Sequence, residues 1–311
     1  MNKKKSIFVL LALSFSLALV NAQAEGKKAE SKEGNALAQS DSLEGQKNPF
    51  IEIKDFEEEF SRAKTSYSRD TGDFSIEPMD KSVKITKKAV ILSPEEEGVV
   101  YTISGYFKGQ LINRTKNTVI KLNNAFIENN SGSPAIYGEA KTEISTVAGT
   151  KNFLLSTGRS EDKTAAIQGR KNLVLGGSGN LYVKGTVYHG IKGDDLKIKG
   201  SGKYFVQGSK KGAGIKCDSF LVEEGKNFTA CFFDSKNGIK ADNTIKISSG
   251  NFYFSGLATT LKTDTKKDAP AEEHGISLMG GSIHRKNVQN FYFTEKNAYQ
   301  QADSGLLIQD D

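Results

Sequence analysis

Lysine and aspartate recur together at a fixed interval in this chain. Three Gly-Ile-Lys triplets end at Lys192, Lys216 and Lys240, 24 residues apart, and an aspartate follows two residues after each lysine. On neighbouring strands the lysines would form one column and the aspartates another, because residues two apart share a face and paired strands lie about 4.8 Å apart. Carboxylates and turn carbonyls are ligands that calcium prefers. The candidate calcium ligands are Asp194, Asp195, Asp218, Asp242 and Asp264.

The lysine column suggests a second chemistry, the binding of an acidic sugar polymer. A polymer lying along the column would meet one ammonium group per strand, from Lys192, Lys216 and Lys240. The alternative is a solvated face without a ligand. Like charges at this spacing repel by about 1 kcal/mol in water, and two columns of opposite sign neutralise each other.

Tyrosine rings stack on the apolar face of a sugar ring, which makes outward-facing tyrosines candidate contacts for a carbohydrate. The candidates are Tyr182, Tyr188 and Tyr204. Because side chains alternate between the two faces of a strand, some of these rings must lie in the core instead.

Adjacent acids also raise the question of catalysis. Asp194 and Asp195 lie close to His189, and inverting glycosidases use a pair of carboxyl groups. However, an aspartate stands at the place equivalent to Asp194 after the other two triplets, so the first role of Asp194 is structural. The motif spacing of polygalacturonases is also not reproduced. We therefore assign no catalytic residue. A hydrolase or lyase of the pectin type remains an alternative, since fold alone does not settle function.

The elements that would position these residues are short strands. Each triplet is followed by an alternating apolar and polar run, such as Leu196–Lys199, then by a glycine-rich turn and a second run, such as Gly202–Val206. A period of this length with three strands predicts a right-handed parallel β-helix of about 24-residue coils over residues 76–311. The polar stretch 266–273 is expected to loop out.

The beginning of the chain predicts export. Lys3, Lys4 and Lys5 precede an apolar stretch, and small residues end at Ala24, which is typical of a signal peptide over residues 1–24. Residues 25–75 are polar and are predicted to be a disordered spacer, with a short helix around the acidic run 57–59. We expect a secreted, periplasmic or cell-surface protein, without a membrane-spanning segment after cleavage.

Charge and cysteine content narrow the function further. The chain has 43 basic and 37 acidic residues, a balance that gives no support for nucleic acid as a partner. Cys217 and Cys231 permit one disulfide, but Cys217 occupies the slot held by Ala241 in the next repeat, so two buried thiols are the preferred interpretation.

Several motifs together resemble a family of secreted bacterial carbohydrate-binding proteins. They are Tyr101–Gly105, Ile120–Ala125, Ser133–Tyr137, Leu181–Gly185, His189–Leu196 and Asn237–Lys240, within about residues 82–281. The resemblance implies a right-handed β-helix that binds cellulose or polygalacturonate, carries calcium and has no established catalysis.

The sequence therefore predicts non-catalytic binding of an extracellular polysaccharide, an acidic or cellulose-like glycan, assisted by calcium. A purely structural or adhesive surface protein is a further alternative. A binding protein should concentrate tyrosine, lysine and aspartate on one face, whereas a structural spacer should spread them.

Overall fold

The computed structural model describes residues 48–69, 74–264, 275–294, 299–302 and 305–310. The signal peptide predicted for residues 1–24, much of the predicted spacer and the predicted loop 266–273 lie outside these ranges. No helix among the described residues is long and apolar enough to cross a membrane.

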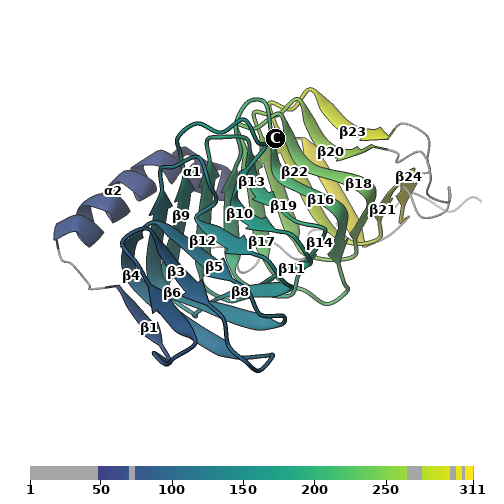
Figure 1. The fold of residues 1–311 in the computed structure, drawn as a ribbon. Helices are drawn as coiled ribbons and strands as arrows, with labels where there is room; N and C mark the ends of the chain where they lie inside the picture. The colour runs from purple at the N-terminus through teal and green to yellow at the C-terminus, as the bar shows by residue number, and fades with distance from the viewer. Residues whose placement is uncertain (1–47, 70–73, 265–274, 295–298, 303–304, 311) are drawn as a thin grey trace, which may run out of the picture. The chain divides into compact units, whose positions relative to one another are not determined.

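The strands form a mostly parallel sheet that divides into three series of paired strands, which we call faces A, B and C (Figure 1). Face A contains β3 (Ala89–Leu92), β5 (Gln110–Asn113), β7 (Ile136–Gly138), β10 (Ala165–Gly169), β13 (His189–Lys192), β20 (Thr259–Thr263) and β23 (Asn290–Thr294). Face B contains β8 (Thr142–Thr146), β11 (Leu173–Gly177), β14 (Asp195–Ile198), β21 (Gly275–Leu278) and β24 (Tyr299–Gln301). Face C contains β9 (Lys151–Ser156), β12 (Asn180–Gly185), β15 (Lys203–Gln207), β17 (Thr229–Phe233), β19 (Asn251–Ser255), β22 (Gly281–Lys286) and β25 (Leu306–Asp310).

Longer strands pass from one face to the next. The strands β16 (Ala213–Val222) and β18 (Asn237–Ile247) belong to face A and then to face B, and β4 (Val100–Lys108) and β6 (Thr118–Asn129) belong to face B and then to face C. At the N-terminal end, β1 (Ser75–Glu77) pairs antiparallel with β4, and β2 (Val83–Ile85) pairs antiparallel with β3.

The register pairs the lysines of the predicted repeat with one another. Lys192 pairs with Lys216, Lys216 with Lys240, and Lys240 with Lys262, each on the next strand of face A. We call the chain between such register-equivalent residues a coil. The all-β, mostly parallel architecture is consistent with a β-helix, and its coil size and handedness stay predictions.

Aliphatic and aromatic residues on the inner side of the strands form the main core. One inward column on face A contains Ile167, Ile191, Ile215, Ile239 and Leu261, all fully buried. A side chain on the glycine before each isoleucine would collide with the core: a Cβ on Gly238 would lie 2.5 Å from Cε1 of Phe254. The Gly-Ile part of the triplet is therefore structural, and within the triplet only the lysine side chain lies on the outer side of the strand.

The spacer predicted over residues 25–75 is wrong for its second half. Residues Pro49–Lys54 form helix α1 and Phe56–Arg69 form helix α2, and both pack on face C. Asn48 caps α1 by accepting a hydrogen bond from the backbone N–H of Phe50 at 2.9 Å. The short helix expected around residues 57–59 exists, but it is longer and docked. The predicted boundary failed because three buried phenylalanines, at 50, 56 and 60, hold this otherwise polar segment.

Both cysteines are free and buried, as preferred from the sequence. Cys217 pairs in register with Ala241, in the slot expected for it. Burial raises the pKa of both thiols.

Candidate functional site

The predicted lysine column exists on the outer side of face A. Its members are half-buried along their stems, and Lys216 and Lys240 reach toward aspartates of the following coil. Lys216 forms an ion pair with Asp242, and Lys240 forms one with Asp264. Lys192 instead donates a hydrogen bond to the carbonyl oxygen of Lys163 at 3.3 Å.

Two aspartates of the aspartate column form ion pairs with these lysines. Asp264 accepts Lys240 and also lies 3.3 Å from Nζ of Lys262. Burial alone would raise the pKa of Asp264, but the hydrogen bond and charge of Lys240, with Lys262, outweigh it and lower the pKa. Lys216 and Lys240 thus link neighbouring coils through Asp242 and Asp264, which favours the self-neutralising interpretation there.

Calcium fits this column poorly. Within the described ranges, no group of three or more His, Cys, Asp or Glu side chains converges as a metal site would require. Asp218 donates its backbone N–H to the carbonyl of Asp194, which follows from their stacking on successive coils. Asp195 lies apart, on β14 of face B, where it lines a hollow of about 270 Å³ with Lys197 and Lys246. The predicted calcium ligands are therefore stacked along the coils and are not brought together around one point.

The three candidate tyrosines occupy different environments. Tyr204 is 1% exposed and donates to the carbonyl of Gly176 at 3.3 Å inside the coils, so its prediction as a carbohydrate contact is wrong. Tyr182 faces outward on face C, but it is 5% exposed beneath α2, so it is also wrong as an accessible contact. Of the three, Tyr188 lines an open hollow.

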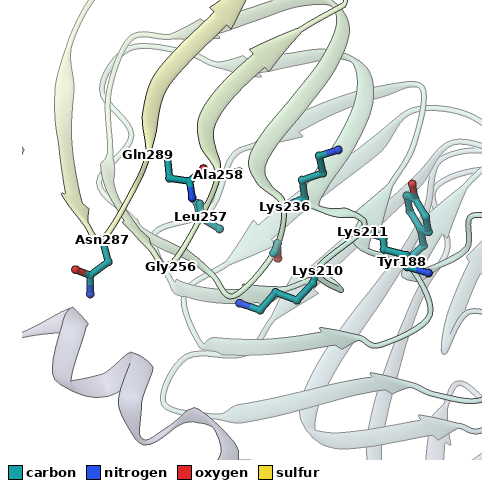
Figure 2. Close-up of a pocket in the computed structure, with 10 residues that line it drawn as sticks. Tyr188, Lys210, Lys211, Lys236, Gly256, Leu257, Ala258, Asn287 and Gln289 are labelled. Atoms are coloured by element: carbon teal, nitrogen blue, oxygen red, sulfur yellow. The ribbon is translucent and has the colours of Figure 1, made fainter.

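That hollow is a groove of about 710 Å³ along the edge between faces C and A, where the turns of successive coils meet (Figure 2). Lys210, Lys211 and Lys236 are exposed around it. The other lining residues are Tyr188, Ser235, Gly256, Leu257, Ala258, Asn287 and Gln289. The groove thus crosses the turns of several coils along the stacking direction.

The charged residues that line this groove are all lysines. Lys210 has an acidic partner, Asp234, at 3.1 Å, in a pair that is largely exposed. Among the ion pairs of the described residues, none involves Lys211 or Lys236. The Nζ atom of Lys163 lies 5.6 Å from the ring centroid of Tyr188, so a further cation stands at the aromatic end of the groove.

Two further hollows lie on the same edge, nearer the N-terminal coils. One, of about 520 Å³, is lined by Lys87, Lys88 and Lys108, and the other, of about 500 Å³, is lined by Arg159 and Glu161. Lysines on other faces are more often engaged: Lys197 lies 3.8 Å from Glu223 on face B, and three lysines of face C pair with the helices. The edge between faces C and A thus has basic side chains at each of these three hollows.

Sequence reasoning missed the groove lysines, although a signal was present. Tyr188, Gly212 and Lys236 each lie two residues before the glycine of a Gly-Ile-Lys triplet. Attention to the turn before the triplet would have placed Tyr188 and Lys236 on one edge, two coils apart.

His189, next to Tyr188, is held as a neutral hydrogen-bond acceptor. Its Nδ1 accepts the backbone N–H of Ala213 at 3.0 Å. Burial, together with the charges of Lys192, Lys216, Lys240 and Lys163, lowers the pKa of His189 to about 3. The imidazole therefore stabilises the start of the next coil by accepting this hydrogen bond.

Comparison with known proteins identifies a family. A family model described as "Carbohydrate-binding domain-containing protein" matches residues 63–306. A solved structure, described as the polysaccharide lyase-like protein from C. thermocellum in a gadolinium derivative, is 20% identical, with a TM-score of 0.48, over 75% of this chain and 93% of that one. No curated protein matches the chain.

Proposed function

Because the chain belongs to the carbohydrate-binding domain-containing protein family, we propose that it binds a polysaccharide without cleaving it, in the groove between faces C and A. The glycan is one with acidic groups. Binding takes place outside the cytoplasm, in keeping with the signal peptide expected from the sequence, and the coils are taken to form a right-handed β-helix.

The observation that carries the proposal is the pair Lys211 and Lys236, exposed beside Tyr188 without an acidic partner among the described ion pairs. An ammonium group that no carboxylate of the protein neutralises is available to a carboxylate of the ligand. The lysines of face A differ, because Asp242 and Asp264 already engage Lys216 and Lys240. The groove therefore replaces the lysine column as the preferred site.

The direction of the groove supports a polymer as ligand. Its lining residues come from successive turns, which lie about 4.8 Å apart along the stack. A sugar chain has a repeat of similar length, so one sugar can face each turn. Tyr188 offers a ring for stacking, while the lysines meet the acidic groups.

The test is depletion of the purified protein from solution by insoluble polysaccharides, acidic and neutral, with and without a chelator. We expect depletion by an acidic glycan that falls as salt rises, because exposed charges are screened. The chelator should have no effect, since the aspartate column fits ion pairs better than calcium. The variant Lys211→Gln/Lys236→Gln should bind about 5–30-fold more weakly, from about 1–2 kcal/mol for two exposed charged contacts.

A matched control removes the same charge elsewhere. Lys121 and Lys246 are exposed on face B, so Lys121→Gln/Lys246→Gln changes the net charge equally without touching the groove. Equal loss of binding in both double variants would reduce the site to nonspecific charge attraction. Absence of depletion by every glycan would overturn the proposal and favour a structural or adhesive role.

A further inference from the structure

Face C carries a column of outward-facing aromatic rings. Phe126, Phe153, Tyr182 and Phe205 follow one another in register, and Cys231 and Tyr253 continue the column. Tyr182 stacks on Phe153 with ring centroids 4.7 Å apart and on Phe205 at 4.8 Å, with nearly parallel planes. The faces of Tyr182 are thus occupied by its neighbours, which leaves ring edges toward the outside and makes the column a poor platform for sugar stacking.

Helices α1 and α2, which we call the strap, cover this column. Phe60 lies 6.0 Å from Phe126 and 5.3 Å from Phe153, measured between ring centroids. Phe56 lies 4.6 Å from Phe233, and at the far end Phe50 meets Tyr253 at 5.3 Å. The strap therefore lies across strands from β6 to β19 and runs against the order of the coils.

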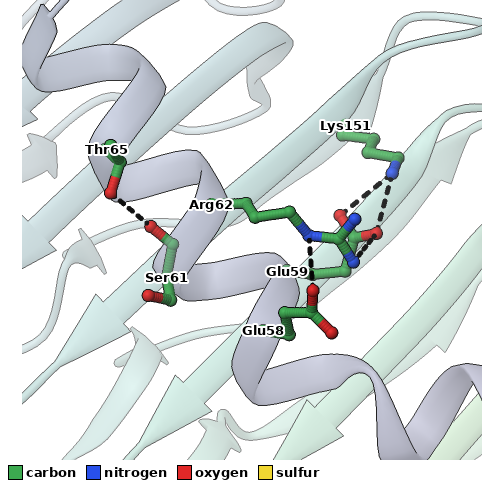
Figure 3. A network of polar contacts seen from close by, with 6 residues as sticks. All are labelled: Glu58, Glu59, Ser61, Arg62, Thr65 and Lys151. Carbon is green, nitrogen blue, oxygen red and sulfur yellow. Dashed lines mark hydrogen bonds and ion pairs between the residues drawn. The ribbon is translucent and has the colours of Figure 1, made fainter.

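Ion pairs along its margins fix the strap to the same strands. Glu59 of α2 holds Lys151 of β9 at 2.9 Å, and Arg62 also reaches Glu59 at 3.4 Å (Figure 3). The pair Glu57 with Lys184 and the pair Glu52 with Lys203, the latter at 3.0 Å, repeat the contact on β12 and β15. These pairs are partly exposed, so buried phenylalanines contribute more to docking than the ion pairs do.

The strap changes how the coils depend on one another. In a solenoid each repeat contacts only its neighbours, so a coil can open without disturbing distant coils. A rigid element that contacts non-adjacent coils adds interactions between distant coils to those between neighbouring coils. The ring contacts of Phe60 and Phe50 lie on strands several coils apart, and α1 and α2 follow one another with a single residue, Asp55, between them.

We propose that the strap couples the coils from β6 to β19 so that they open together. Loosening the strap at one end then raises the opening of coils at the other. This role is independent of the groove and of any polysaccharide.

The two free thiols report on the coupling from two depths. Cys231 lies on face C beneath the strap, three register steps from Phe153, or about 14 Å at the usual strand spacing. Cys217 is buried in the inner core, so it becomes reactive only when a coil opens. Their labelling by a thiol reagent, followed by peptide mapping, separates exposure of the covered face from opening of the coils.

The variant Phe60→Ala removes the ring of the strap that meets Phe126 and Phe153, and Phe153 lies three register steps from Cys231. We expect both Cys231 and Cys217 to label about tenfold faster or more than in the wild type, given the usual cost of removing a buried ring. The control Ile51→Ala changes an exposed apolar residue of α1 and should leave both rates unchanged. The variants Cys217→Ala and Cys231→Ala assign each rate.

Acceleration of Cys231 alone would overturn the proposal, because the strap would then be a local cover without coupling. Unchanged labelling of both thiols would overturn it too. If Phe60→Ala does not fold, the milder Phe60→Leu should accelerate both thiols by a smaller, similar factor, and unequal acceleration would count against coupling.

Discussion

The ion pair between Lys216 and Asp242 offers the sharpest test of what the aspartate column does. The two side chains are 17% and 25% exposed and join strands β16 and β18 of consecutive coils. The variant Asp242→Asn removes the carboxylate charge and leaves the ammonium group of Lys216 in a half-buried position. We expect the protein to become less stable through loss of this link.

The magnitude follows from the burial of the pair. Exposed ion pairs are worth about 0.2–1 kcal/mol, while breaking a fully buried pair costs about 3–5 kcal/mol. A pair of intermediate burial should therefore cost about 1–2 kcal/mol of the free energy of unfolding. The control Glu95→Gln breaks a pair with Lys81 whose members are 81% and 83% exposed, and it should cost less than about 1 kcal/mol.

The assay is urea unfolding followed by circular dichroism, with calcium and with a chelator. A double-mutant cycle with Lys216→Met isolates the coupling energy, which should be about 1–2 kcal/mol. Calcium should leave every curve unchanged. If the column held calcium, the wild type would gain about 2.7 kcal/mol at a hundredfold excess over the dissociation constant, and Asp242→Asn would lose that gain. That result would refute the ion-pair interpretation.

Three other predictions concern residues whose environments are equally defined. Burial opposes ionisation of Glu128, but Lys64 at 2.9 Å and the hydroxyl of Tyr106 at 2.8 Å outweigh it, so its pKa lies below the ordinary 4.5. The stabilising contribution of the ionised Glu128 is therefore present above pH 4.5 and is lost as the pH falls through the lowered pKa. The difference in free energy of unfolding between wild type and Glu128→Gln, measured by urea unfolding across pH, should therefore shrink on acidification. A constant difference would contradict this. Gly238→Ala should cost about 1–3 kcal/mol, because the new methyl group meets Phe254, and an unchanged melting curve would show that the core yields there. Tyr188→Ala should weaken depletion by acidic glycans, whereas Tyr204→Phe should leave depletion unchanged, since Tyr204 lies inside the coils; the reverse ranking would remove Tyr188 from the groove site.

The repeat could be predicted from the sequence because period and alternation together fix a register. Once Lys192, Lys216 and Lys240 are aligned, the pairing of Ile191 with Ile215 and of Cys217 with Ala241 follows, and the structure confirms both. The turns before the triplets share a position but no residue type, since Tyr188, Gly212 and Lys236 occupy equivalent places. The groove lysines were therefore missed, although they lie close in sequence to the predicted column.

The docking of α1 and α2 escaped prediction for a different reason. Averaged over 25–75, the composition is polar, and Phe50, Phe56 and Phe60 within it gave no hint of a partner. The third strand of each coil did contain a hint: Leu181–Val183 and Tyr204–Val206 are continuously apolar instead of alternating. A strand buried on both faces has this pattern. Tyr182 and Tyr204 looked equivalent for the same reason, since one faces the strap and the other the core.

Along the described part of the chain, helices α1 and α2 come before all of the strands and run opposite to the order of the coils. Tyr67 and Phe60 meet Phe126 on an early coil, and Phe50 meets Tyr253 on a late one. A polypeptide that is synthesised from its N-terminus thus has the helical segment available before its first coil. Each new coil then docks on the next aromatic ring of the helices that has no contact yet. The coils can then add one after another to the helical segment. The segment and the first coil are close in sequence, so the entropy cost of loop closure is smallest at the start. The order predicts that Phe60→Ala slows refolding more than Phe50→Ala does; equal slowing would mean that the helices dock only after the stack is complete.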